Sequence, residues 1–405
     1  MATINLIDHH LETQFEKYQL EDHSREVFKN FQHIDYKNVS KKNLNYFALY
    51  IRSPFHGVNK LMEKIPNDIF LLMQQGIIRP LIIMITEQWD LFYASAWKNK
   101  FSFTPDFSQV PYSNMVKHFT SRAVPEENIT WLIPMNHHVE QIQFMRQKGY
   151  KIKAKFIQYD YFLEKMKPVA KKNNITSKKF KKYFSCLCRG APRNHRFGIV
   201  YNLWREGLID KGNVSCGLYV ELDEVTGSKA IDERVTTSTF MNNFQDWSKK
   251  GNTFKSELPI EFDNTDNQHW YNTDENYIFS NSFLWIASET CKKNQEGIYI
   301  TEKTWKAIAY GSPFCINGDN GSLDYLRQQG YKTFNDYWDE SYDHMNDVEK
   351  INHISNIVKN ICSMDLTDIN SLYKEMIPIL EHNQQTLIRN TQHNELIQEL
   401  SNVQS

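Results

Sequence analysis

The chain of 405 residues has almost no net charge, because its 47 basic residues are matched by 48 acidic ones. A near-neutral balance gives no overall electrostatic reason to expect a nucleic-acid partner or an anionic membrane surface. The longest apolar stretches, such as LIIMI at residues 81–85, are far too short to span a bilayer. The N-terminus MATINLIDHH lacks the charged-then-apolar pattern of a secretion signal. We therefore expect a cytoplasmic protein without a membrane span.

Cysteine is scarce, with six residues in the chain and no C-x-x-C pair. Cys186 and Cys188 stand two apart on a predicted strand, so their side chains share one face. This spacing allows a metal-binding pair, but thiols in such apolar segments are more often small buried hydrophobic residues. The pattern therefore favours Cys186 and Cys188 as buried core residues over a metal-binding pair.

Several familiar ligand motifs are missing. The sequence has no G-x-x-x-x-G-K-[ST] loop, no G-x-G-x-x-G and no H-E-x-x-H, which removes the usual signatures of P-loop, dinucleotide and zinc-protease sites. It has no D-x-D either, a spacing in which two carboxylates could hold a metal ion. We expect no metal and no cofactor.

The length and the alternation of elements predict two α/β domains. In the first half, apolar β-rich runs at 77–85, 128–136 and around 151–159 alternate with helical stretches near 59–75 and 139–149. Strand, helix, strand with short connections is typical of a parallel sheet. A further helix is expected over 11–34, where polar residues are interrupted by spaced apolar ones.

The second half repeats the alternation. Strands are predicted at KYFSCLCRG, NVSCGLY, SFLWIASE and PFCIN, with helices between them and apolar residues at helical spacing from Val348 onward. Between the halves, the lysine-rich stretch at 166–182 has the composition of a solvated linker. The alternative for this stretch is a binding patch. The expected division is an α/β domain at 1–165, a linker at 166–182, an α/β domain at 183–345 and a helical segment at 346–405.

Two strand-to-helix junctions in the second half hold the side chains that are candidates for ligand binding or catalysis. The first is CRGAPRNHRFG, where Arg189, Arg193 and Arg196 surround a turn just before a helix. A helix start attracts anions, and guanidinium groups bind oxyanions in pairs of hydrogen bonds. The alternative is a basic loop whose arginines pair with local carboxylates.

The second junction is GIYITEKTWKAIAYGSPFCING, residues 297–318. Thr301 is placed to cap the helix, with Glu302 and Lys303 in the first turn. A lysine there is unfavourable beside the positive end of the helix dipole, and a bound diphosphate facing Lys303 and the helix amides would remove the conflict. Glu302 is suited to accept hydrogen bonds from two ribose hydroxyls. The alternative for Lys303 is an ordinary surface lysine.

The run YITEKTWKAIAYGSPFCING resembles the donor-binding signature of the α1,3-fucosyltransferase family and its relatives, which have two facing Rossmann-like domains (the GT-B fold). Tyr299, Thr301, Glu302 and Lys303 match that signature position by position. NYIFSNSFLWIASET is similar to the strand that leads into it, and APRNHRFGIVYNL to the arginine-led helix of the family. The resemblance covers about 180–345.

The resemblance implies an α/β fold with two Rossmann-like domains facing a cleft and C-terminal helices. It also implies transfer of a sugar from a nucleotide diphosphate sugar to an acceptor hydroxyl, with inversion and without a metal. The donor-binding residues would be Arg193, Tyr299, Thr301, Glu302 and Lys303, and Arg196 and Lys303 would stabilise the departing diphosphate. The 183–345 domain would then bind the donor, and the 1–165 domain would face the acceptor.

The general base is expected in the first half, which matches no part of the family. Our preferred residue is Glu87 in LIIMITEQWD, at the carboxyl end of a strand where α/β sheets place ligands. Asp90, Glu140, His137 and His138 are the rivals. A base must lie within hydrogen-bond reach of the acceptor hydroxyl, and a solvent-facing loop carboxylate is the alternative for Glu87.

Two other functions remain open from the sequence. One is a module that binds a nucleotide sugar or a glycan without turnover. The other is a glycosyltransferase whose acceptor is modified DNA rather than a glycan, prompted by the lysine-rich stretch and opposed by the neutral net charge.

Overall fold

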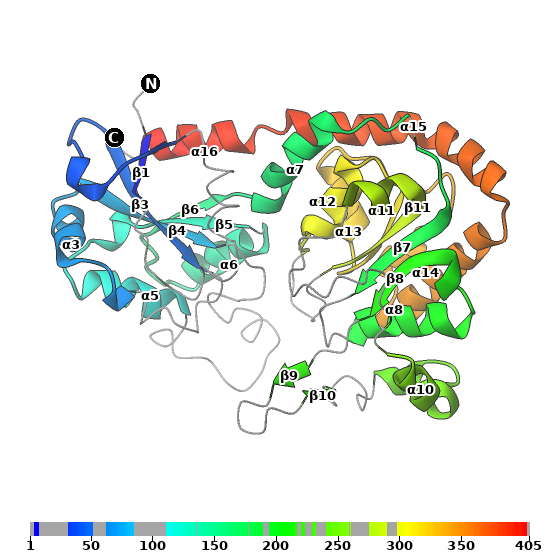
Figure 1. Cartoon of the computed structure of the whole chain (residues 1–405). Coiled ribbons are helices and arrows are strands. Elements are labelled where there is room, and N and C mark those ends of the chain that lie inside the picture. Colours follow the sequence, from blue (N-terminus) through cyan, green and yellow to red (C-terminus); the bar gives the residue numbers. More distant parts are fainter. Residues whose placement is uncertain are drawn as a thin grey trace. The chain divides into compact units, whose positions relative to one another are not determined.

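The computed structural model describes most of the chain (Figure 1). The described residues are 4–7, 31–51, 62–84, 111–134, 136–176, 178–188, 194–216, 220–222, 229–231, 240–258, 260, 275–289 and 298–402. They divide into two compact units. Unit 1 comprises the described residues up to Lys165, Ile298 and 390–402, and unit 2 comprises the others.

Unit 1 is built on a six-stranded sheet in the order β2-β1-β3-β4-β5-β6. Each pair of neighbouring strands is parallel, as the strand-helix alternation predicts. The strands are β1 (Ile4–Ile7), β2 (Gln32–His33), β3 (Leu44–Ile51), β4 (Ile78–Met84), β5 (Thr130–Ile133) and β6 (Lys155–Gln158). The helical elements are η2 (Tyr36–Asn38), α3 (Asn67–Gln74), α5 (Pro111–Thr120), η4 (Glu126–Asn128), α6 (Asn136–Gln147), the start of α7 (Tyr161–Lys172) and α16 (Gln392–Ser401).

Both faces of this sheet are buried. On β4, Ile78 and Ile82 join an apolar cluster with residues of α3, α5 and α6, whereas Leu81 and Ile83 join a second cluster with Leu396 and Leu400 of α16 and with the start of α7. Alternate residues of a strand point to opposite faces, so the apolar run of β4 matches a strand covered on both sides.

Unit 2 contains a four-stranded parallel sheet in the order β12-β11-β7-β8. Its strands are β7 (Lys182–Cys188), β8 (Gly212–Cys216), β11 (Ser282–Ser288) and β12 (Phe314–Asn317), and β9 (Val220–Leu222) and β10 (Lys229–Ile231) form a separate antiparallel pair. The helical elements are α8 (Asn194–Arg205), η5 (Ile209–Lys211), η6 (Met241–Asn243), α10 (Trp247–Ser256), α11 (Glu275–Asn281), α12 (Glu302–Ala309), α13 (Ser322–Gln328), η7 (Ser341–His344), α14 (Asp347–Cys362) and α15 (Leu366–Arg389).

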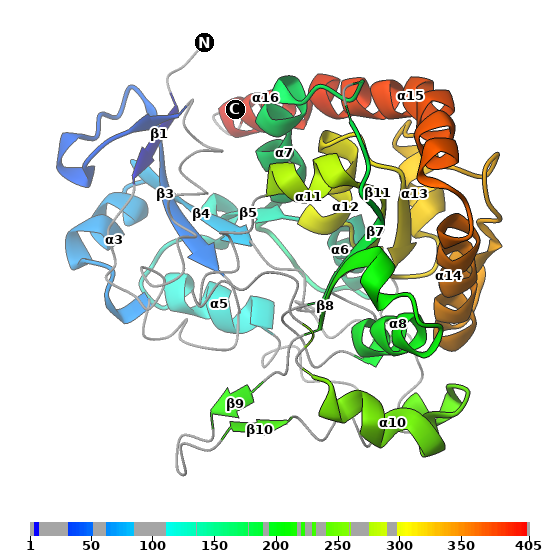
Figure 2. The same ribbon diagram turned by 45° about the vertical axis from the view of Figure 1, so that its right-hand side comes forward.

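Helices cover both sides of this sheet as well. α8 and α14 pack against each other and against β7, whereas α12 packs on β11 and on α15. The views agree that α11 and α12 lie on the other side of the sheet from α8 and α14 (Figures 1 and 2). The predicted α/β fold class, with parallel sheets and C-terminal helices, is therefore confirmed for each unit.

The sequence-based expectations missed part of unit 1. β1 and β3 were not predicted, although β3 runs through the middle of the sheet. The helix expected over 11–34 is wrong at its end, where Gln32 and His33 form β2, and residues 11–30 lie outside the described part. All four strands predicted for the second half are present.

The lysine-rich stretch differs from the solvated linker that its composition predicts. Its first part completes α7, and Ile175 and Phe180 are buried. Ile175 packs against Gly311, whose φ of 61° needs a glycine and where an added Cβ would lie 2.1 Å from Cγ2 of Ile175. The helical tail is also divided, because α14 and α15 belong to unit 2 and α16 belongs to unit 1.

Lys178 provides a test of this internal packing. Its ammonium donates to the carbonyl of Gly311 at 3.0 Å and to Oγ of Ser312 at 2.9 Å, and burial lowers the pKa of Lys178 to about 7. Between pH 7 and 10.5 only the unfolded state holds this proton, so the group makes the free energy of unfolding rise with pH.

We expect Lys178→Met to lose that rise, which is at most about 1.4 kcal/mol per pH unit. Urea unfolding at pH 7 and pH 9 measures it, with the exposed neighbour Lys179→Met as the matched control. If the free energy of unfolding depends on pH in the same way in the natural protein and in Lys178→Met, the ammonium of Lys178 lies in solvent.

None of the described helices combines the length and the apolar character that crossing a membrane requires.

Candidate functional site

The two junctions singled out in the sequence meet at one edge of the unit 2 sheet. β7 and β11 are neighbours and parallel, so the loops that leave their carboxyl ends start side by side. From β7 the chain continues to β8 on one flank, and from β11 it continues to β12 on the other. This is the topological switch point at which open α/β sheets bind ligands. Residues about a hundred positions apart are thereby brought together.

The start of α8 is tied to the end of β11. Nε of Arg196 donates to the carbonyl of Ser288 at 3.1 Å, and Nε2 of His195 pairs with the carbonyl of Glu289 at 2.8 Å. Arg196 is buried, so its charge lies close to the edge of the sheet instead of in bulk solvent. Arg189 and Arg193 lie outside the described residues.

Thr301 caps α12 as predicted, but its side chain is fully enclosed. The hydroxyl accepts from the amide of Lys303 at 3.4 Å and from its ammonium at 3.2 Å, and it donates to Oε2 of Glu289. A hydroxyl has one proton and two lone pairs, so all of its hydrogen-bonding capacity is used within the protein. Thr301 thus links Glu289 to Lys303, and its direct contact with the donor, which the resemblance implies, stays a prediction.

The body of α12 agrees with its sequence pattern. Trp305, Ile308 and Ala309, predicted to face the sheet, are all buried. The helix ends before Gly311, whose left-handed φ of 61° is the usual stop signal. Tyr299, just before the cap, is also buried.

Glu302 and Lys303 form an ion pair, with 2.6 Å between Oε1 and Nζ. The lysine side chain is 19% exposed and the glutamate side chain 31%. Burial acts to raise the pKa of Glu302, but the charges of Lys303 and Lys306 outweigh it and lower that pKa to about 2. The unfavourable place of a lysine at the positive helix end is thus relieved by Glu302, without the phosphate that the sequence argument invoked.

The first amides of α12 also have partners within the protein. The Thr301 amide donates to Oε1 of Glu289 at 3.2 Å, and the Lys303 amide to Oγ1 of Thr301. These two amides are thus satisfied within the protein, and the predicted contact between the helix amides and a phosphate stays a prediction. Arg196 and Lys303 supply positive charge at this junction.

The positive charges of Arg196 and Lys303 act on the thiol of Cys188, which lies at the end of β7. Its pKa lies below the ordinary value because of a hydrogen bond with Cys186 and the positive charges of Arg196 and Lys303, although burial acts in the opposite direction. Cys186 and Cys188 share a face as predicted, with their sulfurs 3.9 Å apart and both side chains buried. The positive charges of both Arg196 and Lys303 therefore act at the end of β7.

Glu289 is the site residue that sequence reasoning missed. It follows β11 directly and is completely buried. The available signal was the one used for Glu87, a carboxylate at the end of an apolar strand. Glu87 and Asp90 lie outside the described residues, and His137, His138 and Glu140 fall on the first part of α6, of which only the backbone is described.

Within the described residues, one group has the composition of a metal site. Asp324, Asp343 and His344 each place a ligand atom within 4.8 Å of the others. Its members already have partners: Asp324 pairs with Arg327 at 2.7 Å and with His344 at 3.0 Å, and Oδ2 of Asp343 accepts from the Leu323 amide at 3.0 Å. Nothing in the sequence pattern pointed to this group.

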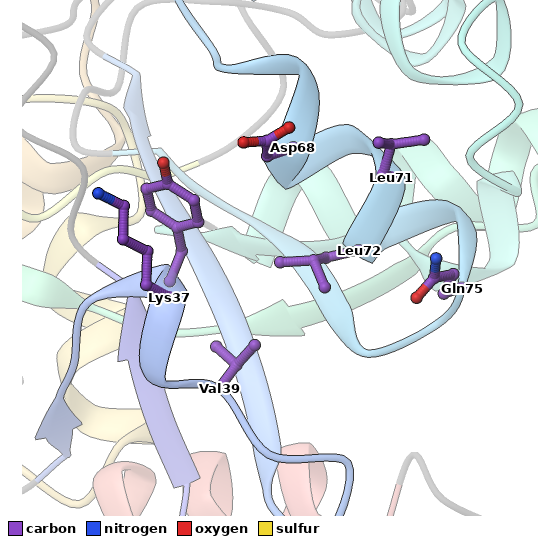
Figure 3. Close-up of a pocket in the computed structure, with 7 residues that line it drawn as sticks. Lys37, Val39, Asp68, Leu71, Leu72 and Gln75 are labelled. Carbon is purple, nitrogen blue, oxygen red and sulfur yellow. The ribbon is translucent and has the colours of Figure 1, made fainter.

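A shallow cavity of about 400 Å³ lies in unit 1, between η2 and α3 (Figure 3). It is lined by Tyr36, Asp68, Leu72 and Gln75, among others. Among the residues that the structure describes, none of those proposed from the sequence borders it.

Comparison with protein-family models and with curated protein sequences gives no match. Among solved structures, the chain is similar to one described as the GtfA/B complex, with 11% identity and a TM-score of 0.38, covering 89% of this chain and 58% of the other. It is also similar to a mutant of T4 phage BGT in complex with UDP-glucose, with 11% identity and a TM-score of 0.35, covering 100% and 97%. The chain thus spans less than two thirds of the first. Likenesses this slight carry no argument about function, which must come from the site.

Proposed function

We propose that the protein is a glycosyltransferase that moves a sugar from a nucleotide diphosphate sugar to an acceptor hydroxyl. The observation that carries the proposal is the convergence of Arg196 and Lys303 at the switch point of the unit 2 sheet. Two cations at such an edge are suited to a diphosphate, which carries negative charge when bound and gains more as it departs. The run that resembles the donor-binding signature of the α1,3-fucosyltransferase family includes Lys303, and the segment that resembles the arginine-led helix of that family includes Arg196.

We propose the following roles for the residues of the site. Lys303 leaves Glu302 to face the diphosphate, with Arg196 on its other side. Glu302, freed from the ion pair, accepts from the ribose hydroxyls. Tyr299 lies beside the nucleoside base or phosphate, and Arg193 adds a further cation. Inversion of the sugar requires a base on the acceptor side, for which Glu87 in the first half is proposed.

A thermal-shift screen against GDP, UDP, CMP and dTDP sugars tests the donor class. A ligand at a hundred times its dissociation constant stabilises the folded state by about 2.7 kcal/mol. Release or transfer of the sugar from the stabilising donor would then separate an enzyme from a binding module. A screen in which no nucleotide sugar raises the melting temperature would contradict the proposal.

We predict that EDTA leaves transfer essentially unchanged, because the proposed chemistry relies on Lys303 and Arg196 for charge. Turnover with and without 5 mM chelator, at about saturating donor, is the measurement. The variant Asp324→Asn is the control, since it alters the one described cluster with metal-ligand composition. Loss of activity in EDTA, reversed by Mn²⁺ and mirrored by Asp324→Asn, would show that a metal at this cluster takes part.

A further inference from the structure

Glu289 makes an unusual set of contacts for a glutamate that is completely buried. Its Oε1 accepts from the Thr301 amide at 3.2 Å and from the Thr304 hydroxyl at 2.6 Å, and its Oε2 accepts from the Thr301 hydroxyl. A carboxylate is costly to bury unless donors surround it. These three donors all come from the start of α12, the helix that carries Lys303.

The backbone of Glu289 reaches the other elements of the site. Its carbonyl pairs with His195 at the start of α8, and its amide donates to the carbonyl of Asn317 in β12 at 3.1 Å. Gly318 packs so closely on Glu289 that an added Cβ would lie 3.2 Å from its Cβ and Cγ. One residue thus contacts the starts of both helices and the end of the neighbouring strand.

We propose that Glu289 is a positioning residue that fixes Lys303 and Arg196 relative to each other, so that both cations act on one diphosphate. The inference rests on the function proposed above. Through Thr301, whose hydroxyl accepts from the ammonium of Lys303, the carboxylate of Glu289 sets one cation. Through the peptide that joins it to Ser288, whose carbonyl accepts from Arg196, Glu289 sets the other.

The test is Glu289→Gln in the full chain. Glutamine keeps the shape and one carbonyl oxygen, but its amide group presents N–H donors to a threonine hydroxyl that itself donates. α12 must then shift or turn its cap. We expect kcat to fall about a hundredfold at temperatures well below the melting transition, because small misplacements of catalytic groups cost that much.

A double-mutant cycle separates positioning from mere support of the fold. If Glu289 acts through Lys303 and Arg196, the part of its effect that runs through Lys303 is already lost in Lys303→Ala, so the loss of kcat in the double variant is smaller than the product of the two single losses. Glu340→Gln is the matched control. Glu340 is a second buried glutamate of unit 2, which accepts from the Phe334 amide at 2.8 Å, and its variant should lose stability with unchanged kcat.

Hydrogen exchange gives a readout that does not depend on activity. We expect faster exchange of the amides in 299–309 in Glu289→Gln and not in Glu340→Gln. The inference would be overturned if Glu289→Gln had the kinetic constants of the natural protein. It would also be overturned if the loss of kcat in the double variant equalled the product of the two single losses. Faster exchange at α12 in a protein that neither binds nor transfers a nucleotide sugar would support the positioning of Lys303 and overturn the proposed function instead.

Discussion

Lys303→Ala is expected to lower donor affinity and to reduce turnover by about 10²–10³-fold. The ammonium lies at the switch-point edge and is held by Glu302 and Thr301. In the proposed reaction it interacts with charge already present on the diphosphate and with charge that grows as the sugar bond breaks. The fold should survive, since Thr301 still caps α12, Trp305 still faces the core and alanine suits a helix at least as well as lysine.

The measurement is calorimetric titration with the nucleotide from the screen, followed by turnover at saturating donor. Lys306→Ala, a lysine in the last turn of the same helix, is the matched control and should change neither constant by more than about twofold. Glu302→Ala should weaken nucleotide binding more than it slows chemistry, because the ribose does not react. Unchanged affinity and rate in both Lys303→Ala and Glu302→Ala would show that the two residues form a structural ion pair with no role in donor binding or transfer.

Glu87→Gln is expected to retain the fold and donor binding and to lose most transfer, by about 10²–10⁴-fold. Glu87 follows the last residue of β4, Met84, by three positions, and the carboxyl end of a parallel strand is where such sheets place reactive groups. Glutamine keeps the size of the side chain and removes its ability to take a proton from the acceptor hydroxyl.

Single-turnover kinetics with the donor pre-bound measure the chemical step for this variant. Asp90→Asn, altered in the same segment, is the control and should transfer at close to the natural rate. Near-normal transfer by Glu87→Gln together with a large loss in Asp90→Asn, or in variants of His137 and His138, would move the base to that residue.

The sequence was most informative where one local pattern decides the outcome. The apolar runs of β4, β7, β11 and β12 and the spaced apolar residues of α12 each predicted an element that the structure contains. β3 was missed although residues 46–51 form an uninterrupted apolar run; the part of β3 that local composition does not explain is Asn45. Its amide side chain is buried and accepts from Asn5 at 2.8 Å, and a partner forty residues away cannot be read from local composition.

The site was predicted in part for the same reason. Thr301 as the cap follows from residues next to one another, whereas the enclosure of Thr301 depends on Glu289, twelve positions earlier in the chain. The prediction of a solvated linker at 166–182 was wrong because it rested on average composition. The packing of this segment depends on individual residues such as Ile175, Phe180 and Lys178.

The central claim is that a nucleotide diphosphate sugar binds where α8 and α12 begin. Hydrogen exchange with and without the stabilising nucleotide tests it most directly, because it locates the ligand without assuming a reaction. The proposal predicts slower exchange in two separate peptides, one covering 194–200 and the other 298–309, with no change over α10 at 247–256. Protection confined to unit 1, or absent from both helix starts while the nucleotide still raises the melting temperature, would contradict it.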